Sequence, residues 1–316
     1  MADASPFEHP TLSRWQALQG LAERLELLLM APQATGNFPA SVEAMTRELD
    51  NLMVDDVDLG VFEVVRIGPE KLSRYGSLHS LHTACVVWLV AHRKEWTAAK
   101  RLSALSAALT MNIAVTDLQT TLALQSSPLT DAQRQRMREH PLDSERLLRG
   151  LGVLDEDWLS AVAQHHEQPD GQGYPQGLTR MTDLADVLRT CDVFCAKMSP
   201  RNGRPAMLSP TAAMSIFHQR SANKFGASVV TTIGVFPPGA LVALNTGEQA
   251  IVTARTTDPL RPMVALLTDE RGQPLDAPVG AATGKDAGRP VAGAARDASL
   301  AELFTPTDVL RTRGSN

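Results

Sequence analysis

Apolar residues recur at helical spacing through most of the chain up to about residue 226. Over 12–30 they fall near one face of a helix, and the segments 41–53 and 77–125 continue the pattern with short interruptions. Thr130 and Gln133 have the spacing of a capping box, so a helix should begin there, and we expect it to end at Pro141. Ser209 and Pro210 predict the start of another helix.

The pattern changes after about residue 227. Residues there are often β-branched, and turn signals such as Pro237-Pro238-Gly239 separate them, which predicts a small antiparallel sheet or barrel of three to five strands. The fold class predicted is therefore mainly α, with a small C-terminal β extension. The segment VDLGVFEVVRI, residues 57–67, fits either a helix or a short strand.

Four regions follow from these patterns. We expect a helical N-terminal region over 1–70, a helical domain over 71–226, a small β extension over 227–280 and a Gly/Ala-rich flexible tail over 281–316. The N-terminal helices either sense a signal or form a homodimer.

Composition excludes several classes of partner. The net charge of -5 over 316 residues gives no basic footprint, so we expect no nucleic-acid partner. The three cysteines lack CxxC spacing, which favours a reducing compartment, and no apolar run reaches the roughly 18 residues that a membrane span needs. No signal peptide is visible. The prediction is a cytoplasmic protein without a membrane span.

Several side chains that could bind a metal lie on separate predicted helices. Imidazole and carboxylate groups bind borderline and hard metals, and facing helices of a bundle can bring them together. Neither an HExxH motif nor a paired CxxC occurs, so spacing alone does not establish a site. The candidates are His79, His82, His140, His165, His166 and Asp192.

The order of four short stretches adds a family resemblance. YGSLHS, REHP, HHEQPDGQGYP and LRTCDVFCAKMSPRNGR follow one another between Tyr75 and Gln219. Together they closely resemble the HD-GYP domain, a bacterial group of the HD phosphohydrolase superfamily. The resemblance implies a helical HD-type bundle in which two or three iron- or manganese-type ions activate a water that hydrolyses cyclic di-GMP.

The resemblance also implies roles for individual residues. His79, His140, His165, His166 and Asp192 match metal ligands of the family. The loop that lies near the substrate is matched by Asp170, Gly171, Gly173, Tyr174 and Pro175. Arg201 and Arg204 form either a phosphate-binding rim or a solvated helix end.

The sequence departs from the family at the motif that gives the superfamily its name. Met111 and Asn112 stand where the family has His-Asp, and Val115 stands where it has Lys. The bridging carboxylate and the phosphate-facing cation are therefore missing, which should impair two-metal catalysis. We expect at most one divalent ion, iron or manganese, and the alternative is none.

The surviving ligands are unevenly distributed. His140, His165 and His166 belong to one metal position in the family and all remain, with water or Asn112 as a further ligand. His79 and Asp192 belong to the other position. Asp192 is either a ligand or a structural hydrogen-bond partner of His79.

Three functions compete. The first is a catalytically impaired module in cyclic di-GMP signalling that binds the nucleotide, a GGDEF domain or another signalling protein. The second is a metal-dependent phosphodiesterase that hydrolyses cyclic di-GMP or another phosphoester with a reduced site. The third is a helical scaffold without a ligand. We favour the first, so the protein need not be an enzyme.

Overall fold

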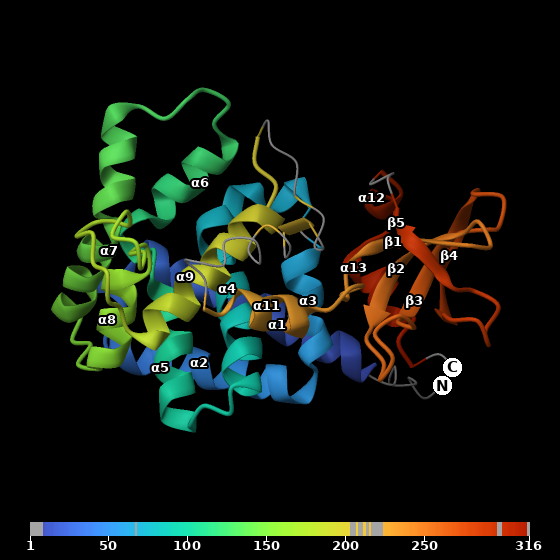
Figure 1. Cartoon of the computed structure of the whole chain (residues 1–316), viewed down its shortest axis with the longest axis horizontal. Coiled ribbons are helices and arrows are strands. Elements are labelled where there is room, and N and C mark those ends of the chain that lie inside the picture. The colour runs from blue at the N-terminus through green and yellow to red at the C-terminus, as the bar shows by residue number, and fades with distance from the viewer. Residues whose placement is uncertain are drawn as a thin grey trace, which may run out of the picture. The chain divides into compact units, whose positions relative to one another are not determined.

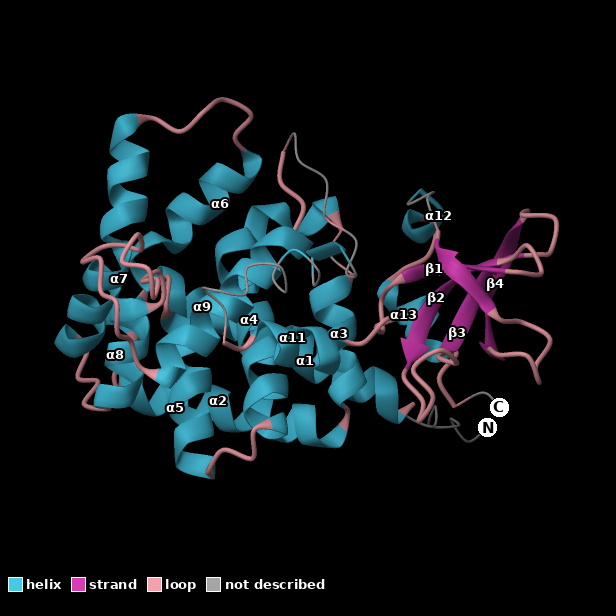
Figure 2. Cartoon of the chain, viewed as in Figure 1, coloured by secondary structure: helices cyan, strands magenta, loops and turns pink. Residues whose placement is uncertain are grey.

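The computed structural model describes residues 9–66, 68–202, 207, 211–212, 215, 224–295 and 299–314. The chain forms two compact units. One consists of residues 21–53 and 67–234, and the other consists of residues 1–20, 54–66 and 235–316. Figure 1 traces the chain and Figure 2 distinguishes its helices from its strands. The helix expected at Ser209 and the site candidate Arg204 lie outside the described residues.

The first unit is helical, as predicted. Its central helix is α4 (Tyr75–Arg93), in which every residue from Tyr75 to Ala91 is buried. A helix that is buried on all sides must be surrounded by others, and α5, α6, α9 and α11 pack against it. The other elements of this unit are η1 (Pro32–Ala34), α2 (Phe38–Asp55), η2 (Pro69–Arg74), α5 (Ala98–Thr110), η3 (Ile113–Val115), α6 (Thr116–Leu124), α7 (Asp131–Gly150), α8 (Glu156–Gln164), α9 (Asp183–Met198) and α11 (Gly226–Ile233).

Side-chain caps fix where these helices begin. The capping box predicted at Thr130 and Gln133 is present at the start of α7. Asp155 and Thr182 accept hydrogen bonds from backbone amides in the first turns of α8 and α9. These caps set the register of the three helices that carry most of the site.

The prediction that this helix ends at Pro141 is wrong, because α7 continues to Gly150 with the proline inside it. A proline in a helix cannot donate to the carbonyl four residues earlier, which here is that of Met137. His140 occupies that carbonyl instead, since its Nδ1 lies 2.8 Å from the oxygen of Met137. The backbone acceptor is satisfied, and the helix can continue.

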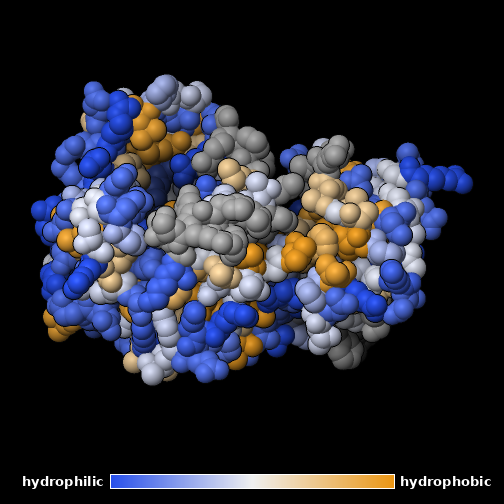
Figure 3. All heavy atoms as spheres, in the orientation of Figure 1, coloured by the Kyte–Doolittle hydropathy of each residue, from blue (hydrophilic) through white to orange (hydrophobic). Residues whose placement is uncertain are grey.

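The second unit contains the predicted β extension. Five antiparallel strands lie in the order β4-β3-β2-β1-β5, and the register pairs Leu241 with Ile251 and Ile251 with Ala265. Val242, Val252 and Val264 lie in the buried core of the sheet. In Figure 3 apolar atoms gather over this unit, whereas the visible face of the helical unit is mostly polar. The strands are β1 (Leu241–Leu244), β2 (Gln249–Ala254), β3 (Met263–Thr268), β4 (Pro274–Ala282) and β5 (Val291–Ala294).

Helices from both ends of the chain complete this unit. They are the first half of α1 (Pro10–Met30), then α3 (Val57–Val65), α12 (Ser299–Glu302) and α13 (Pro306–Arg311). The ambiguous segment 57–67 therefore forms a helix over most of its length. Asp58 on α3 accepts hydrogen bonds from the backbone amide and the Nε of Arg255, at 2.9 and 2.6 Å, which ties α3 to the end of β2.

Two of the predicted boundaries need correction. Residues 281–316 are not a uniformly loose tail, because β5 pairs with β1 and α13 contains the buried residues Val309 and Leu310. Residues 1–70 do not form one region, since they are divided between the two units. Both errors arise because contacts with distant parts of the chain decide these boundaries. Within the described residues, no helix is long and apolar enough to cross a bilayer.

Candidate metal centre

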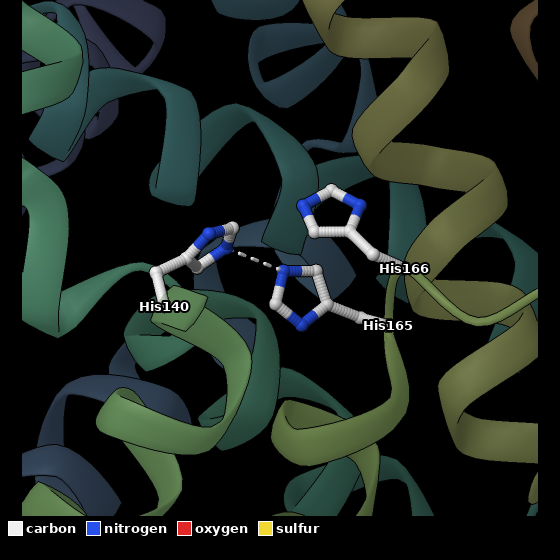
Figure 4. A group of neighbouring side chains, drawn as sticks. All are labelled: His140, His165 and His166. Carbon is white, nitrogen blue, oxygen red and sulfur yellow. Dashed lines mark hydrogen bonds between the residues drawn. The ribbon is translucent and has the colours of Figure 1, made fainter. Parts of the chain in front are cut away.

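Three histidines converge in the helical unit, as Figure 4 shows. His140 lies on α7, His165 closes α8 as its C-cap, and His166 follows directly. The Nε2 atoms of His140 and His165 are 3.1 Å apart, and the His166 ring centroid lies 5.0 Å and 4.2 Å from those of His140 and His165. Nitrogen atoms of all three could be shared by one metal ion.

The backbone sets the tautomers of the two facing rings. Nδ1 of His140 lies 2.8 Å from the carbonyl oxygen of Met137, and Nδ1 of His165 lies 2.6 Å from that of Val162. A carbonyl can only accept, so each Nδ1 carries the proton and donates it. Each Nε2 is then an unprotonated acceptor when the ring is neutral. Two lone pairs that face each other at 3.1 Å repel unless a cation lies between them.

Burial keeps these rings neutral. It is the main cause that lowers the pKa of His140 to about 3, and the nearby His165 adds to it. The pKa of His165 is also lowered by burial, and that of His166 falls well below its usual value for the same reason. Neutral imidazole is the form that binds a metal, because the lone pair must be available.

His79 and Asp192, the candidates for a second metal position, contact each other instead. Nε2 of His79 on α4 lies 2.6 Å from Oδ1 of Asp192 on α9, and both side chains are buried. Although burial opposes it, the hydrogen bond and charge of His79 hold the pKa of Asp192 well below its usual range. The structural pairing considered for Asp192 is therefore present. The other Asp192 oxygen lies 3.9 Å from Nδ1 of His166, which joins this pair to the three histidines.

The three replaced motif residues are all buried. Met111, Asn112 and Val115 are at most 2% exposed. Met111 and Val115 are apolar, so their burial leaves no polar group without a partner. The amide of Asn112 is different, because neither its Oδ1 nor its Nδ2 has a hydrogen-bond partner among the described residues. An unpaired buried amide destabilises a protein by about 1–3 kcal/mol, so Asn112 is where a ligand or water would be stabilised.

Two hydrogen bonds place the segment around Asn112 between the helices that carry the histidines. Thr110 accepts a hydrogen bond from Nε1 of Trp158 on α8, at 2.8 Å. The amide of Ala114 donates to Oγ of Ser144 on α7, one turn beyond His140. Residues 111–113 therefore connect a residue that contacts the first turn of α8 with a residue that contacts α7 one turn beyond His140.

These residues fit one metal ion better than two. Two nitrogen ligands about 2.05 Å from a common ion in tetrahedral geometry lie roughly 3.3 Å apart, close to the 3.1 Å observed between His140 and His165. The second position would have to use His79 and Asp192, whose Nε2 and Oδ1 atoms are hydrogen-bonded to each other. The centre can thus hold one cation against neutral imidazoles.

The signature loop packs directly on this centre. The ring of Tyr174 lies 4.6 Å from that of His166, and the amide of Tyr174 donates to the His166 carbonyl at 3.1 Å. Gly173 is required, because a Cβ there would lie 2.3 Å from the amide nitrogen of Gln168. Gly171 has a φ of 73°, and Pro175 follows a cis peptide bond. Asp170 accepts a hydrogen bond from the amide of Gln172.

Sequence reasoning missed two residues of this loop's surroundings. Glu167 is completely buried, and its two oxygens accept hydrogen bonds from the amides of Gln176 and Leu178, at 2.7 and 2.8 Å. Arg138 lies over the ring of Tyr174 at 5.9 Å. The position of Glu167 directly after the paired histidines could have indicated its role. Nothing in the sequence around Arg138 indicated a contact with Tyr174.

Arg201 is engaged with an aromatic side chain. Its guanidinium lies 5.0 Å from the ring centre of Tyr75 and donates to the Tyr75 hydroxyl at 2.7 Å. Tyr75 in turn stacks on His79, with the ring centroids 5.5 Å apart. Arg201 is therefore linked to Asp192 through three successive contacts, by way of Tyr75 and His79.

Comparison with known proteins agrees with this geometry. Residues 69–229, about half of the chain, match the family described as HD domain. A Pseudomonas aeruginosa protein named cyclic di-GMP phosphodiesterase PA4108 is 33% identical over 131 residues, which cover 39% of the chain and 31% of that protein. The chain thus spans less than a third of the length of this relative.

A solved structure has the same fold. Bd1817, described as an HDG"Y"P protein from Bdellovibrio bacteriovorus, superposes with a TM-score of 0.58 at 13% sequence identity, and the match covers 72% of each chain. The helical unit, its convergent histidines and the family match over residues 69–229 lead to one conclusion: the chain belongs to the HD domain family and carries the signature loop of its HD-GYP group.

Proposed function

We propose that this protein is an HD-GYP module that binds cyclic di-GMP without hydrolysing it efficiently. The observation that carries the proposal is the burial of Met111, Asn112 and Val115 at the motif positions. They supply no carboxylate to bridge two ions and no cation to face a phosphate. A bound metal ion would polarise a phosphate oxygen and lower the pKa of a water. One ion cannot also stabilise the leaving oxygen in the manner of a pair.

The loop and rim support retained binding. Tyr174 offers an aromatic face beside His166, on which a base could stack. Arg138 lies over the ring of Tyr174 and Arg201 over that of Tyr75, and guanidinium groups pair well with phosphate oxygens. The relation to the Pseudomonas aeruginosa phosphodiesterase makes cyclic di-GMP the nucleotide to test first.

Calorimetric titration of the full chain with cyclic di-GMP tests the proposal. We expect saturable binding that Tyr174→Ala weakens at least tenfold, while Leu154→Ala, at a residue that is 87% exposed on another loop, leaves it unchanged. Chromatography of the same samples after incubation with divalent metals should show intact nucleotide. Turnover that His166→Ala abolishes would refute the proposal.

The second candidate is a phosphodiesterase with a single ion, and the intact set of three histidines favours it. Three histidines with an open position form a competent catalytic site in other folds. In that case His140, His165 and His166 would hold the ion. The carboxylate of Asp192, positioned by its hydrogen bond with His79, would supply a negative charge near the attacking water. The turnover measurement above separates the two candidates directly.

A GGDEF domain or another signalling protein is the remaining partner class. The half-exposed loop at Tyr174 and Pro175 is the surface that such a partner would contact. A pull-down with a purified GGDEF domain tests this contact, and the loop variant Tyr174→Ala should reduce capture. Equal capture of the wild-type chain and the Tyr174→Ala variant would mean that the partner contacts another surface.

A further inference from the structure

The donors that converge at the centre carry no charge. His140 and His165 present Nε2 lone pairs because the carbonyls of Met137 and Val162 hold their Nδ1 protons. The third member, His166, has its Nδ1 on the side of Asp192, 3.9 Å from Oδ2, so its Nε2 is available toward the other two rings. The side chain at the bridging position, Asn112, is a neutral amide.

The nearby carboxylates are already engaged. Asp192 accepts from His79 at 2.6 Å through Oδ1, and its Oδ2 lies 3.9 Å from Nδ1 of His166, the ring nitrogen that is not directed at the other two histidines. Glu167 uses both oxygens to accept from the loop amides of Gln176 and Leu178. Among the described residues, the group of side chains that could share an ion consists of histidines alone.

We propose that this centre selects zinc(II) over manganese(II) and iron(II), in contrast to the iron- or manganese-type ions that the family resemblance implies. Zinc readily accepts four ligands with nitrogen donors, whereas manganese prefers carboxylate, carbonyl and water oxygens in octahedral sites. Affinity for nitrogen sites also rises from manganese through iron to zinc. This inference rests on the metal position assumed in the proposed function and names the ion that it takes.

Asn112 is the remaining candidate ligand, because its side chain is 1% exposed and neither of its polar atoms has a hydrogen-bond partner in the described part of the chain. An amide oxygen is an acceptable fourth ligand or a hydrogen-bond acceptor for a zinc-bound water. The Asn112 amide adds no negative charge, so it does not supply the carboxylate oxygen that manganese prefers. The specificity should consequently depend on residue 112 more than on any other position.

Metal competition on the full chain tests the proposal. Metal-free protein is dialysed against equal concentrations of zinc, manganese and iron(II) without oxygen, and the bound metals are quantified by mass spectrometry. We expect about one zinc per chain and less than a tenth as much of the other two. Cobalt(II), used as a spectroscopic substitute, should give the intense visible absorption of a four-coordinate nitrogen site.

Variants separate specificity from folding. Asn112→Asp should raise the affinity for manganese at least tenfold, whereas Met111→Leu, which changes only packing, should leave the zinc preference intact. His165→Ala should abolish zinc binding. Circular dichroism verifies that each variant is folded. If His165→Ala is not folded, His166→Gln takes its place in the experiment. Equal or greater manganese binding by the wild-type chain, or two ions per chain, would overturn the proposal.

The result is independent of the nucleotide experiment. Zinc selectivity is decided by bound metal and by the cobalt spectrum, and neither measurement requires cyclic di-GMP. A chain that binds zinc but no nucleotide would refute only the proposed function. A chain that binds the nucleotide but prefers manganese would refute only the metal assignment.

Discussion

Replacing Pro141 with alanine should make the protein more stable and its metal binding weaker. In the wild-type helix the proline cannot donate to the Met137 carbonyl, and Nδ1 of His140 donates there instead, at 2.8 Å. Alanine would introduce a backbone N–H in the helical position that normally bonds this carbonyl. The new donor would compete with the imidazole for the same oxygen.

The opposing effects can be weighed. Alanine is favoured over proline inside a helix by about 3 kcal/mol. A weakened His140 hydrogen bond costs about 1 kcal/mol, and the more flexible unfolded chain costs about a further 0.4–1 kcal/mol. We therefore expect the free energy of unfolding of metal-free protein to rise by roughly 1 kcal/mol. Loss of the partner that orients a ligating histidine usually weakens metal binding by about 10–100-fold, and we expect a fall in this range.

Urea unfolding of the metal-free protein and competition with a fluorescent chelator measure the two quantities. Met137→Leu is the matched control, because it changes the side chain but retains the carbonyl, and it should alter neither. Nitrogen NMR of the imidazoles should show that the His140 Nδ1 proton loses its hydrogen bond in Pro141→Ala. Unchanged metal affinity together with a lost hydrogen bond would show that the reasoning is wrong.

Three further predictions follow from the same centre. Glu167→Ala should lower the free energy of unfolding in urea by about 2–3 kcal/mol, because two loop amides lose a charged acceptor; a loss below 0.5 kcal/mol would contradict this. Asn112→Leu should raise the thermal stability of metal-free protein by an amount equivalent to about 1–3 kcal/mol, since it removes a buried amide that has no partner among residues 9–202 and the later described segments; destabilisation would contradict this. The pKa of His140 is lowered by burial to about 3, so the folded side chain stays neutral while the unfolded one protonates below pH 6.5. Metal-free protein should then lose about 1.4 kcal/mol per pH unit from this residue as the pH falls from 6.5 toward 3. Urea titrations at pH 7.5 and 5.5 check the slope, which His140→Asn should reduce.

Local patterns predicted most of the helical unit. Periodicity located the helices, and the pair Thr130 and Gln133 located the start of α7, because a cap depends on residues three positions apart. The end of α7 could not be predicted, because it depended on the side chain of His140 donating to the Met137 carbonyl in place of the missing amide of Pro141. The helix α3 was ambiguous because residues 58–64 are all buried, which removes the contrast between its faces. Strand β5 is stabilised by pairing with β1, about fifty residues earlier, and its own Gly/Ala-rich sequence gives little sign of it.

For the site, the sequence predicted which residues converge but not all of the contacts that they make. The order of the histidines along the chain indicated which residues should converge, and His140, His165 and His166 do lie together. The sequence left open whether Asp192 contacts His79, and only the packing of α9 on α4 decides this. The role of Glu167 was not visible because its partners are backbone amides, which every residue type except proline supplies.

The sheet-containing unit is assembled from segments that are far apart in the sequence, and this has a consequence for synthesis on the ribosome. Asp58 and Arg255 are hydrogen-bonded partners separated by 197 positions, and Arg66 donates to the carbonyl of Phe304 across 238 positions. The early segment 54–66 leaves the ribosome long before its partners exist, and it carries buried residues such as Phe62. Apolar surface of this segment must therefore stay exposed, or be protected by a chaperone, until nearly the whole chain has been made. A version of the protein that ends before residue 235 would keep that surface exposed permanently.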